Sequence, residues 1–130
     1  MSNGTRILIV EDEFVMGRAL AFLFRKEGFQ PDVVGDGGKA LDLLLLDPPD
    51  VVILDLDLPT MSGFEICERL RDDAGTRHVR IIALTASPHE EDRARMMALG
   101  ADEFMTKPFD PALLVERVKE LVSRAEGDRS

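Results

Sequence analysis

The sequence contains no tryptophan and no tyrosine, and its single cysteine is Cys67. One cysteine cannot form an internal disulfide, which indicates a reducing compartment, and we expect the cytoplasm. No apolar run approaches the ~20 residues that a membrane-spanning helix requires, and no signal-peptide pattern opens the chain. Basic residues are outnumbered, because 16 Lys and Arg face 25 Asp and Glu for a formal net charge of -9. This balance argues against direct binding to nucleic acid, and no membrane association is expected.

The remaining composition is that of one folded domain. Hydrophobic residues make up 45% of the 130 residues and charged residues 32%, which is enough apolar side chain for a single core. No repeats or low-complexity segments interrupt it. We therefore expect one domain over residues 1–130, with a core of about residues 6–124 and a polar tail at each end.

Three short apolar runs are unbroken by polar residues, at positions 7–10, 51–54 and 81–84. Such runs are typical of strands that are buried on both faces of a parallel sheet. Two weaker runs, at 32–34 and 103–105, predict strands that are less completely covered. Placing the three strong runs in the centre predicts a sheet with strand order 2-1-3-4-5.

Helix patterns with recognisable ends lie between these runs. Gly28 and Gly100 can end two of the helices, and Asp36 and Asp110 can begin two others. Residues 87–90, with the sequence SPHE, predict a capping box with proline at the first helical position. The apolar spacing predicts inward faces formed by Met16, Leu20 and Leu23, by Ala40, Leu43 and Leu44, and by Leu114, Val118 and Leu121. The predicted fold class is α/β: a five-stranded, doubly wound parallel sheet with helices on both faces.

Charged and hydroxyl side chains follow the ends of the predicted strands. Glu11 and Asp12 come after the first strand, Asp55 after the third, Thr85 after the fourth and Lys107 after the fifth. In a parallel sheet these ends share the edge at which ligands bind. Clustered carboxylates repel one another unless a cation lies among them, and ligands that are all oxygen suit Mg²⁺.

This set of groups can support phosphoryl chemistry. A carboxylate can attack phosphorus and hold the group as an acyl phosphate. Catalysis then consists mainly of neutralising the phosphoryl oxygens. We expect Asp55 to be the nucleophile, Lys107 to supply positive charge and Thr85 to supply a hydroxyl group.

Four motifs carry a resemblance to a known family: Glu11-Asp12, DLDLPTMSG at 55–63, LTA at 84–86 and FMTKPF at 104–109. In this order and spacing, the chain resembles response-regulator receiver domains, the CheY-like family of two-component phosphorelay signalling. The resemblance implies that Asp55 is the phosphoacceptor. It also implies that Mg²⁺ (or Mn²⁺) is bound by Glu11, Asp12, Asp55 and the backbone carbonyl of Asp57.

The same resemblance implies how the phosphoryl group is read. Lys107, before a cis peptide bond to Pro108, would contact the phosphoryl group, and Thr85 and Phe104 would form the switch. We expect the Thr85 hydroxyl to swing toward the phosphoryl group and Phe104 to fill the vacated space from a more exposed position. The donor would be a sensor histidine kinase or a histidine phosphotransferase. The chain would not be an enzyme beyond catalysing its own phosphorylation and dephosphorylation.

Two other functions remain open. A degenerate receiver could act as a constitutive binding module, although no expected site residue is missing. A phosphatase of the haloacid-dehalogenase type also uses D-x-D, but that family places the motif after its first strand and its metal-binding acids downstream. Whether the chain is a stand-alone receiver or part of a longer regulator, and what output it controls, is left open by the sequence.

A mixed-charge face predicts association through the last strand and the last two helices. It is similar to the dimer face of PhoB-type receivers, although Leu113 stands where those receivers have an acid. The alternative is pairing of Glu120 with Arg117 and Arg124 within one helix. We expect a monomer or a weak homodimer that depends on activation, through Arg93, Asp102, Glu103, Arg117, Lys119 and Arg124.

Asp57 is an unusual second acid beside the phosphoacceptor. If its side chain faces the site on the metal side, it should strengthen metal binding and slow reaction with an anionic donor. The alternative is a solvated loop carboxylate.

Overall fold

The computed structural model describes residues 4–87 and 89–128. Within these ranges, five strands alternate with five helices in the order β1 (Arg6–Val10), α1 (Phe14–Lys26), β2 (Gln30–Val34), α2 (Gly37–Leu46), β3 (Val51–Asp55), α3 (Gly63–Asp72), β4 (Arg80–Thr85), α4 (Glu90–Ala98), β5 (Glu103–Thr106) and α5 (Pro111–Asp128). Each predicted strand is present and extends one or two residues beyond its apolar run. None of the helices in these ranges is long and apolar enough to cross a membrane.

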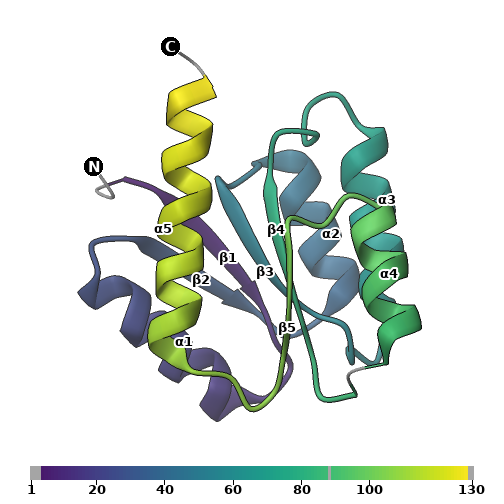
Figure 1. The fold of residues 1–130 in the computed structure, drawn as a ribbon, viewed down its shortest axis with the longest axis horizontal. Helices are drawn as coiled ribbons and strands as arrows, with labels where there is room; N and C mark the ends of the chain where they lie inside the picture. The colour runs from purple at the N-terminus through teal and green to yellow at the C-terminus, as the bar shows by residue number, and fades with distance from the viewer. Residues whose placement is uncertain (1–3, 88, 129–130) are drawn as a thin grey trace.

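The strands form one parallel sheet in the order β2-β1-β3-β4-β5, which confirms the predicted order. Val10 of β1 pairs with Leu54 of β3, and Leu54 pairs with Ala83 of β4, so the central strands end close together. In Figure 1 all the strands run downward, and their carboxyl ends lie at the lower edge of the sheet. The residues that follow the strands therefore meet at that edge.

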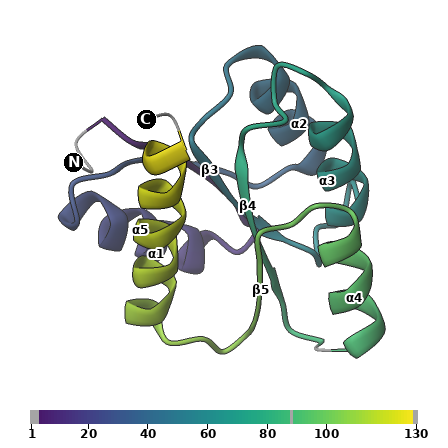
Figure 2. The same ribbon diagram turned by 45° about the horizontal axis from the view of Figure 1, so that its top comes forward.

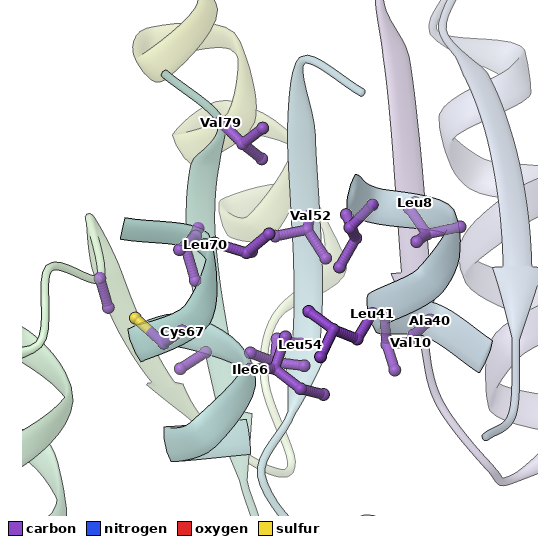
Figure 3. Packing of buried hydrophobic residues seen from close by; sticks show 14 of the residues in the cluster. Leu8, Val10, Ala40, Leu41, Val52, Leu54, Ile66, Cys67, Leu70 and Val79 are labelled. Atoms are coloured by element: carbon purple, nitrogen blue, oxygen red, sulfur yellow. The ribbon is translucent and has the colours of Figure 1, made fainter. Parts of the chain in front are cut away.

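Helices cover both faces of the sheet, with α1 and α5 on one face and α2, α3 and α4 on the other (Figures 1 and 2). Successive residues of a strand point to opposite faces. Ile7 and Ile9 accordingly pack with α1 and α5, whereas Leu8 and Val10 pack with α2 and α3. Figure 3 shows the second cluster, in which Cys67 of α3 is completely buried.

Two helices differ in part from the predicted inward faces, although Leu20 of α1 and Ala40 and Leu44 of α2 are buried as predicted. On α1, Met16 and Leu23 are only half-buried, while Phe24 is completely buried. The reason is Gly17, which lets α1 lie so close to β2 that an added Cβ would come 2.8 Å from Val33 Cγ1. On α2, Leu41 is buried in place of Leu43, which is 44% exposed. The predicted face of α5 is confirmed, since Leu114, Val118 and Leu121 are all buried.

Most of the predicted helix ends are confirmed. The Asp36 carboxylate accepts a hydrogen bond from the backbone N–H of Lys39 at 2.8 Å, and Asp110 accepts one from Ala112 at 2.9 Å. Gly28 and Gly100 have φ values of 90° and 107°, which other residues rarely adopt.

The predicted capping box at residues 87–90 is wrong. Helix α4 begins at Glu90, and His89 takes the N-cap position without a side-chain cap bond to any described residue. Pro88 lies outside the described residues. The Ser87 backbone N–H instead donates to Thr85 Oγ1, so Ser87 lies in the loop after β4 and is bonded to the end of that strand and not to the helix.

Candidate functional site

Three polar side chains are buried at the carboxyl edge of the sheet. Glu11 directly follows β1, Asp55 is the last residue of β3 and Thr85 is the last residue of β4; they are 4%, 2% and 3% exposed. Asp55 is held between neighbouring strands, because the next residue, Leu56, donates its N–H to Leu84 of β4 at 2.8 Å. Buried polar groups require partners, and these partners define the site.

Lys107, just after β5, connects the two buried carboxylates. Its ammonium Nζ lies 2.9 Å from Glu11 Oε1 and 3.0 Å from Asp55 Oδ2. The other oxygen of Asp55, Oδ1, accepts a hydrogen bond from the backbone N–H of Asp57 at 2.9 Å. Both oxygens of Asp55 are therefore oriented. The Lys107–Pro108 peptide bond is cis, as the resemblance implies.

The surroundings of Glu11 and Asp55 shift the pKa values of the two carboxyls in opposite directions. Burial, together with a hydrogen bond to Asp55, raises the pKa of Glu11 to about 7 from its ordinary 4.5, against the pull of Lys107. Burial also acts to raise the pKa of Asp55, but hydrogen bonds from Glu11, the Asp57 N–H and Lys107 lower it overall. Burial acts to lower the pKa of Lys107. The hydrogen bonds to Glu11 and Asp55 and their negative charges outweigh burial, so the pKa of Lys107 is raised overall. Asp55 and Lys107 are therefore both charged at neutral pH.

A group of carboxylates at this edge is suited to a hard cation. Glu11, Asp12 and Asp55 each offer one oxygen, and these oxygens all lie within 4.8 Å of one another. Glu11 Oε2 is buried and has no hydrogen-bond partner among the described residues. Carboxylate oxygens are the ligands that suit Mg²⁺, and this ion usually keeps several of its waters. The exposure of Asp12 leaves room for such waters. The residues present therefore fit the metal that the sequence predicts.

Thr85 and Phe104 lie at the end of β4 and on β5. The Thr85 hydroxyl accepts a hydrogen bond from the Ser87 N–H at 3.0 Å and donates to the Ser87 carbonyl at 3.4 Å, so it is turned to its own loop. Phe104 is only 5% exposed and packs in the core cluster that contains Met96. The expectation that Phe104 rests in a more exposed position is wrong. The Arg93 guanidinium, 5.9 Å from the ring centroid, lies over this inward ring.

The Asp57 side chain faces the loop after β4. Its Oδ2 accepts a hydrogen bond from the backbone N–H of Ala86 at 3.1 Å, in the loop after β4. In the described part of the chain, the acid group comprises Glu11, Asp12 and Asp55 and does not include this carboxylate. Neither of the two alternatives that the sequence left open describes this carboxylate, which lies outside the acid group and is hydrogen-bonded to the loop after β4.

The sequence did not identify two of these contacts. Ser87 as the partner of Thr85 could have been found from its spacing, because a hydroxyl two residues before an N–H commonly forms a local turn. The contact between Asp57 and Ala86 joins residues 29 positions apart and had no local signal.

The residues of the predicted mixed-charge face pair largely within the molecule. Asp102 contacts Arg71 and Arg80 at 3.1 and 3.5 Å. Arg117 contacts Glu103 at 3.3 Å and Glu120 at 3.1 Å. Lys119 reaches across to Glu27 after α1 at 2.7 Å, and Arg93 lies over Phe104. The alternative pairing of Arg117 with Glu120 is present.

The chain is similar to known proteins of one kind. The family model described as "Response regulator receiver domain" matches residues 7–119. The sensory transduction protein RegX3 of Mycolicibacterium smegmatis is 43% identical over 120 residues, which cover 92% of this chain and 51% of RegX3. The phosphate regulon transcriptional regulatory protein PhoB of Escherichia coli is 40% identical over 119 residues, or 92% of this chain and 52% of PhoB. This chain thus spans about half the length of these curated relatives.

A solved structure agrees with this likeness. The receiver domain protein (CheY-like) of Methanospirillum hungatei superimposes with a TM-score of 0.91 at 25% sequence identity, over 97% of this chain and 99% of that one.

Proposed function

The chain belongs to the response regulator receiver domain family, and from this membership we propose that Asp55 accepts a phosphoryl group from a phosphohistidine protein and thereby switches a partner-binding face. The donor would be a sensor histidine kinase or a histidine phosphotransferase in the cytoplasm. The chain would catalyse only its own phosphorylation and dephosphorylation, as a signalling domain and not as an enzyme acting on other substrates. Its output would be a separate partner or a further domain.

The observation that carries the proposal is the position of Lys107. Its ammonium lies within 3.0 Å of Asp55 Oδ2 and 2.9 Å of Glu11 Oε1. A cation at this place keeps Asp55 ionised and ready to act as a nucleophile. It also lies where negative charge on a transferred phosphoryl group would need to be neutralised.

In the proposed reaction, an Asp55 oxygen forms a bond to phosphorus while the bond between phosphorus and the donor imidazole nitrogen breaks. The electron pair of that bond leaves with the imidazole. Lys107 then binds the phosphoryl group in place of the free carboxylate, and the Thr85 hydroxyl turns from Ser87 to a phosphoryl oxygen. Mg²⁺, when bound, neutralises phosphoryl charge. Glu11, Asp12, Asp55 and the backbone carbonyl of Asp57 are its proposed ligands.

The proposed switch differs from the simple exchange that the sequence suggests. Phe104 is already buried, so the Thr85 hydroxyl is the part that must move first. The two contacts of the Thr85 hydroxyl with Ser87 would be exchanged for one with the phosphoryl group. This exchange would move the loop that leads to α4. A partner would read the resulting change around α4, Arg93 and β5.

The proposal is tested by phosphorylation with acetyl phosphate and Mg²⁺. Wild type should gain one acid-labile phosphoryl group, while Asp55→Asn and Asp12→Ala should gain none. Asp42→Asn, which makes the same chemical change at an exposed position of α2, should behave as wild type. Undiminished labelling of Asp55→Asn would place the reaction elsewhere. Absence of labelling in wild type would favour the constitutive binding module.

A further inference from the structure

Asp57 makes two hydrogen bonds that join the phosphoacceptor to the loop after β4. Its backbone N–H donates to Asp55 Oδ1 at 2.9 Å, and its own carboxylate Oδ2 accepts from the Ala86 N–H at 3.1 Å. The register explains the pairing, because Asp55 lies opposite Leu84 and residues 57 and 86 each follow by two positions. The second bond therefore places an anion beside the space into which a phosphoryl group on Asp55 would extend.

The Ala86 N–H is a donor that such a phosphoryl group needs. Lys107 contacts Asp55 at Oδ2. Glu11 and Asp12 lie with Asp55 in the acid group where the metal would bind. Phosphoryl oxygens that pointed toward the end of β4 would meet the Thr85 hydroxyl and the Ala86 N–H. In this structure both are already engaged, the hydroxyl by Ser87 and the N–H by Asp57.

We propose that the Asp57 carboxylate is a built-in competitor of the phosphoryl group for the Ala86 N–H. This inference rests on the proposed function of Asp55. In the resting protein, Asp57 holds the Ala86 N–H and stabilises the loop in its resting arrangement. When a phosphoryl group is present, the two anions repel each other, and the more highly charged one takes the N–H.

The contact is suited to being displaced. Asp57 is exposed, and a hydrogen bond between an exposed carboxylate and a backbone N–H is readily replaced by water. Its effect is therefore to bias the loop and not to lock it. A unit charge at this short range across a hydrated site corresponds to an effect of about three- to tenfold on the binding of an anion.

The test uses the whole chain with beryllofluoride as the phosphoryl mimic at saturating Mg²⁺. Asp57→Ala removes both the charge and the acceptor, whereas Asp57→Asn removes the charge and keeps an acceptor. Glu13→Gln removes an equal charge from an exposed position before α1 and serves as the control. Both Asp57 variants should bind beryllofluoride about three- to tenfold more tightly than wild type, and Glu13→Gln should match wild type within about twofold.

Two further measurements separate competition from a general charge effect. The backbone amide resonance of Ala86 should shift in Asp57→Ala before any ligand is added, and wild type and variant should converge once beryllofluoride is bound. Mg²⁺ affinity without beryllofluoride should change by less than beryllofluoride affinity does, because the carboxylate faces Ala86 and not the acid group.

The outcomes divide clearly. Equal or weaker beryllofluoride binding by both Asp57 variants, or an Ala86 resonance that ignores Asp57→Ala, overturns the competitor while leaving Asp55 as phosphoacceptor. A loss of Mg²⁺ affinity as large as the gain for beryllofluoride would return Asp57 to the metal side and also overturn it. Beryllofluoride that fails to bind wild type, or binds Asp55→Asn equally well, overturns the proposed function itself.

Discussion

At the scale of single residues, the site depends on unequal treatment of two similar carboxyls. Glu11 and Asp55 are both almost completely buried and both contact Lys107, yet burial raises the pKa of Glu11 to about 7 while hydrogen bonds lower that of Asp55. The difference comes from the partners: the hydrogen bond between the two carboxyls lowers the pKa of Asp55 and raises that of Glu11, and Asp55 also receives the Asp57 N–H. The proposed nucleophile is thus the carboxyl that stays charged.

This asymmetry predicts how stability depends on pH when metal is absent. The raised pKa means that folded Glu11 binds a proton more tightly than unfolded Glu11. Its contribution to the free energy of unfolding is fully present below about pH 4.5 and is lost as pH rises through about 7. The loss should be at most about 3–4 kcal/mol, from 1.36 kcal/mol per pKa unit.

Urea unfolding in EDTA at pH values from 4.5 to 7.5 measures this contribution as the difference between wild type and Glu11→Gln. The difference should shrink with rising pH, since the variant lacks the titrating group. Glu13→Gln, whose side chain is exposed, should run parallel to wild type. A difference that stays constant across this range would contradict the raised pKa of Glu11.

At the scale of elements, one side chain of α3 connects the helix to the start of β4 and to the loop before β5. Arg71 donates to the backbone carbonyls of Val79 at 2.6 Å and Gly100 at 2.9 Å, and to the Asp102 carboxylate at 3.1 Å. Asp102 in turn accepts the Ile81 N–H at 2.8 Å. These contacts explain why the Asp102 side chain is turned into the molecule and away from any partner protein.

Replacement of Arg71 by Leu should therefore destabilise the fold. The change leaves the carbonyls of Val79, Gly100 and Arg77 and part of the Asp102 carboxylate without this donor. The cost should be about 2–4 kcal/mol in the free energy of unfolding. Arg69→Leu, at an exposed position of the same helix, should change it by less than about 0.5 kcal/mol. Chemical denaturation of both variants measures the contrast, and equal values for the two would show that the Arg71 contacts contribute nothing.

At the scale of the whole molecule, the charges of the predicted association face are largely satisfied internally. Asp102 pairs with Arg71, Arg117 with Glu103 and Glu120, and Lys119 with Glu27. A second copy would have to compete with these contacts, and exposed ion pairs are individually weak and screened by salt. The resting chain is therefore expected to be a monomer.

Sedimentation tests this expectation together with the proposed activation. Without beryllofluoride the chain should sediment as a monomer at all salt concentrations. With beryllofluoride and Mg²⁺ at low salt we expect a weak dimer that dissociates as salt is raised, and Arg117→Ala should abolish it. Asp42→Asn, at an exposed position of α2 outside this face, should not. A monomer under every condition would rule out this face as a site of self-association.

The sequence by itself determined the fold and the composition of the site. Apolar runs predicted every strand and their order, and Asp36 and Asp110 predicted two helix starts, because each of these signals lies within a few neighbouring residues. Glu11, Asp55, Thr85 and Lys107 were assembled by the same reasoning, since parallel strands end at one edge.

Only the tertiary structure decided where the side chains point. The inward face of α1 depends on the close approach of Gly17 to Val33, and the inward position of Phe104 depends on its packing in the core cluster under α3 and α4. Asp57 faces Ala86 because β3 and β4 bring residues 29 positions apart together. Local periodicity carries no information about such contacts, because each one is set by how two complete elements pack against each other.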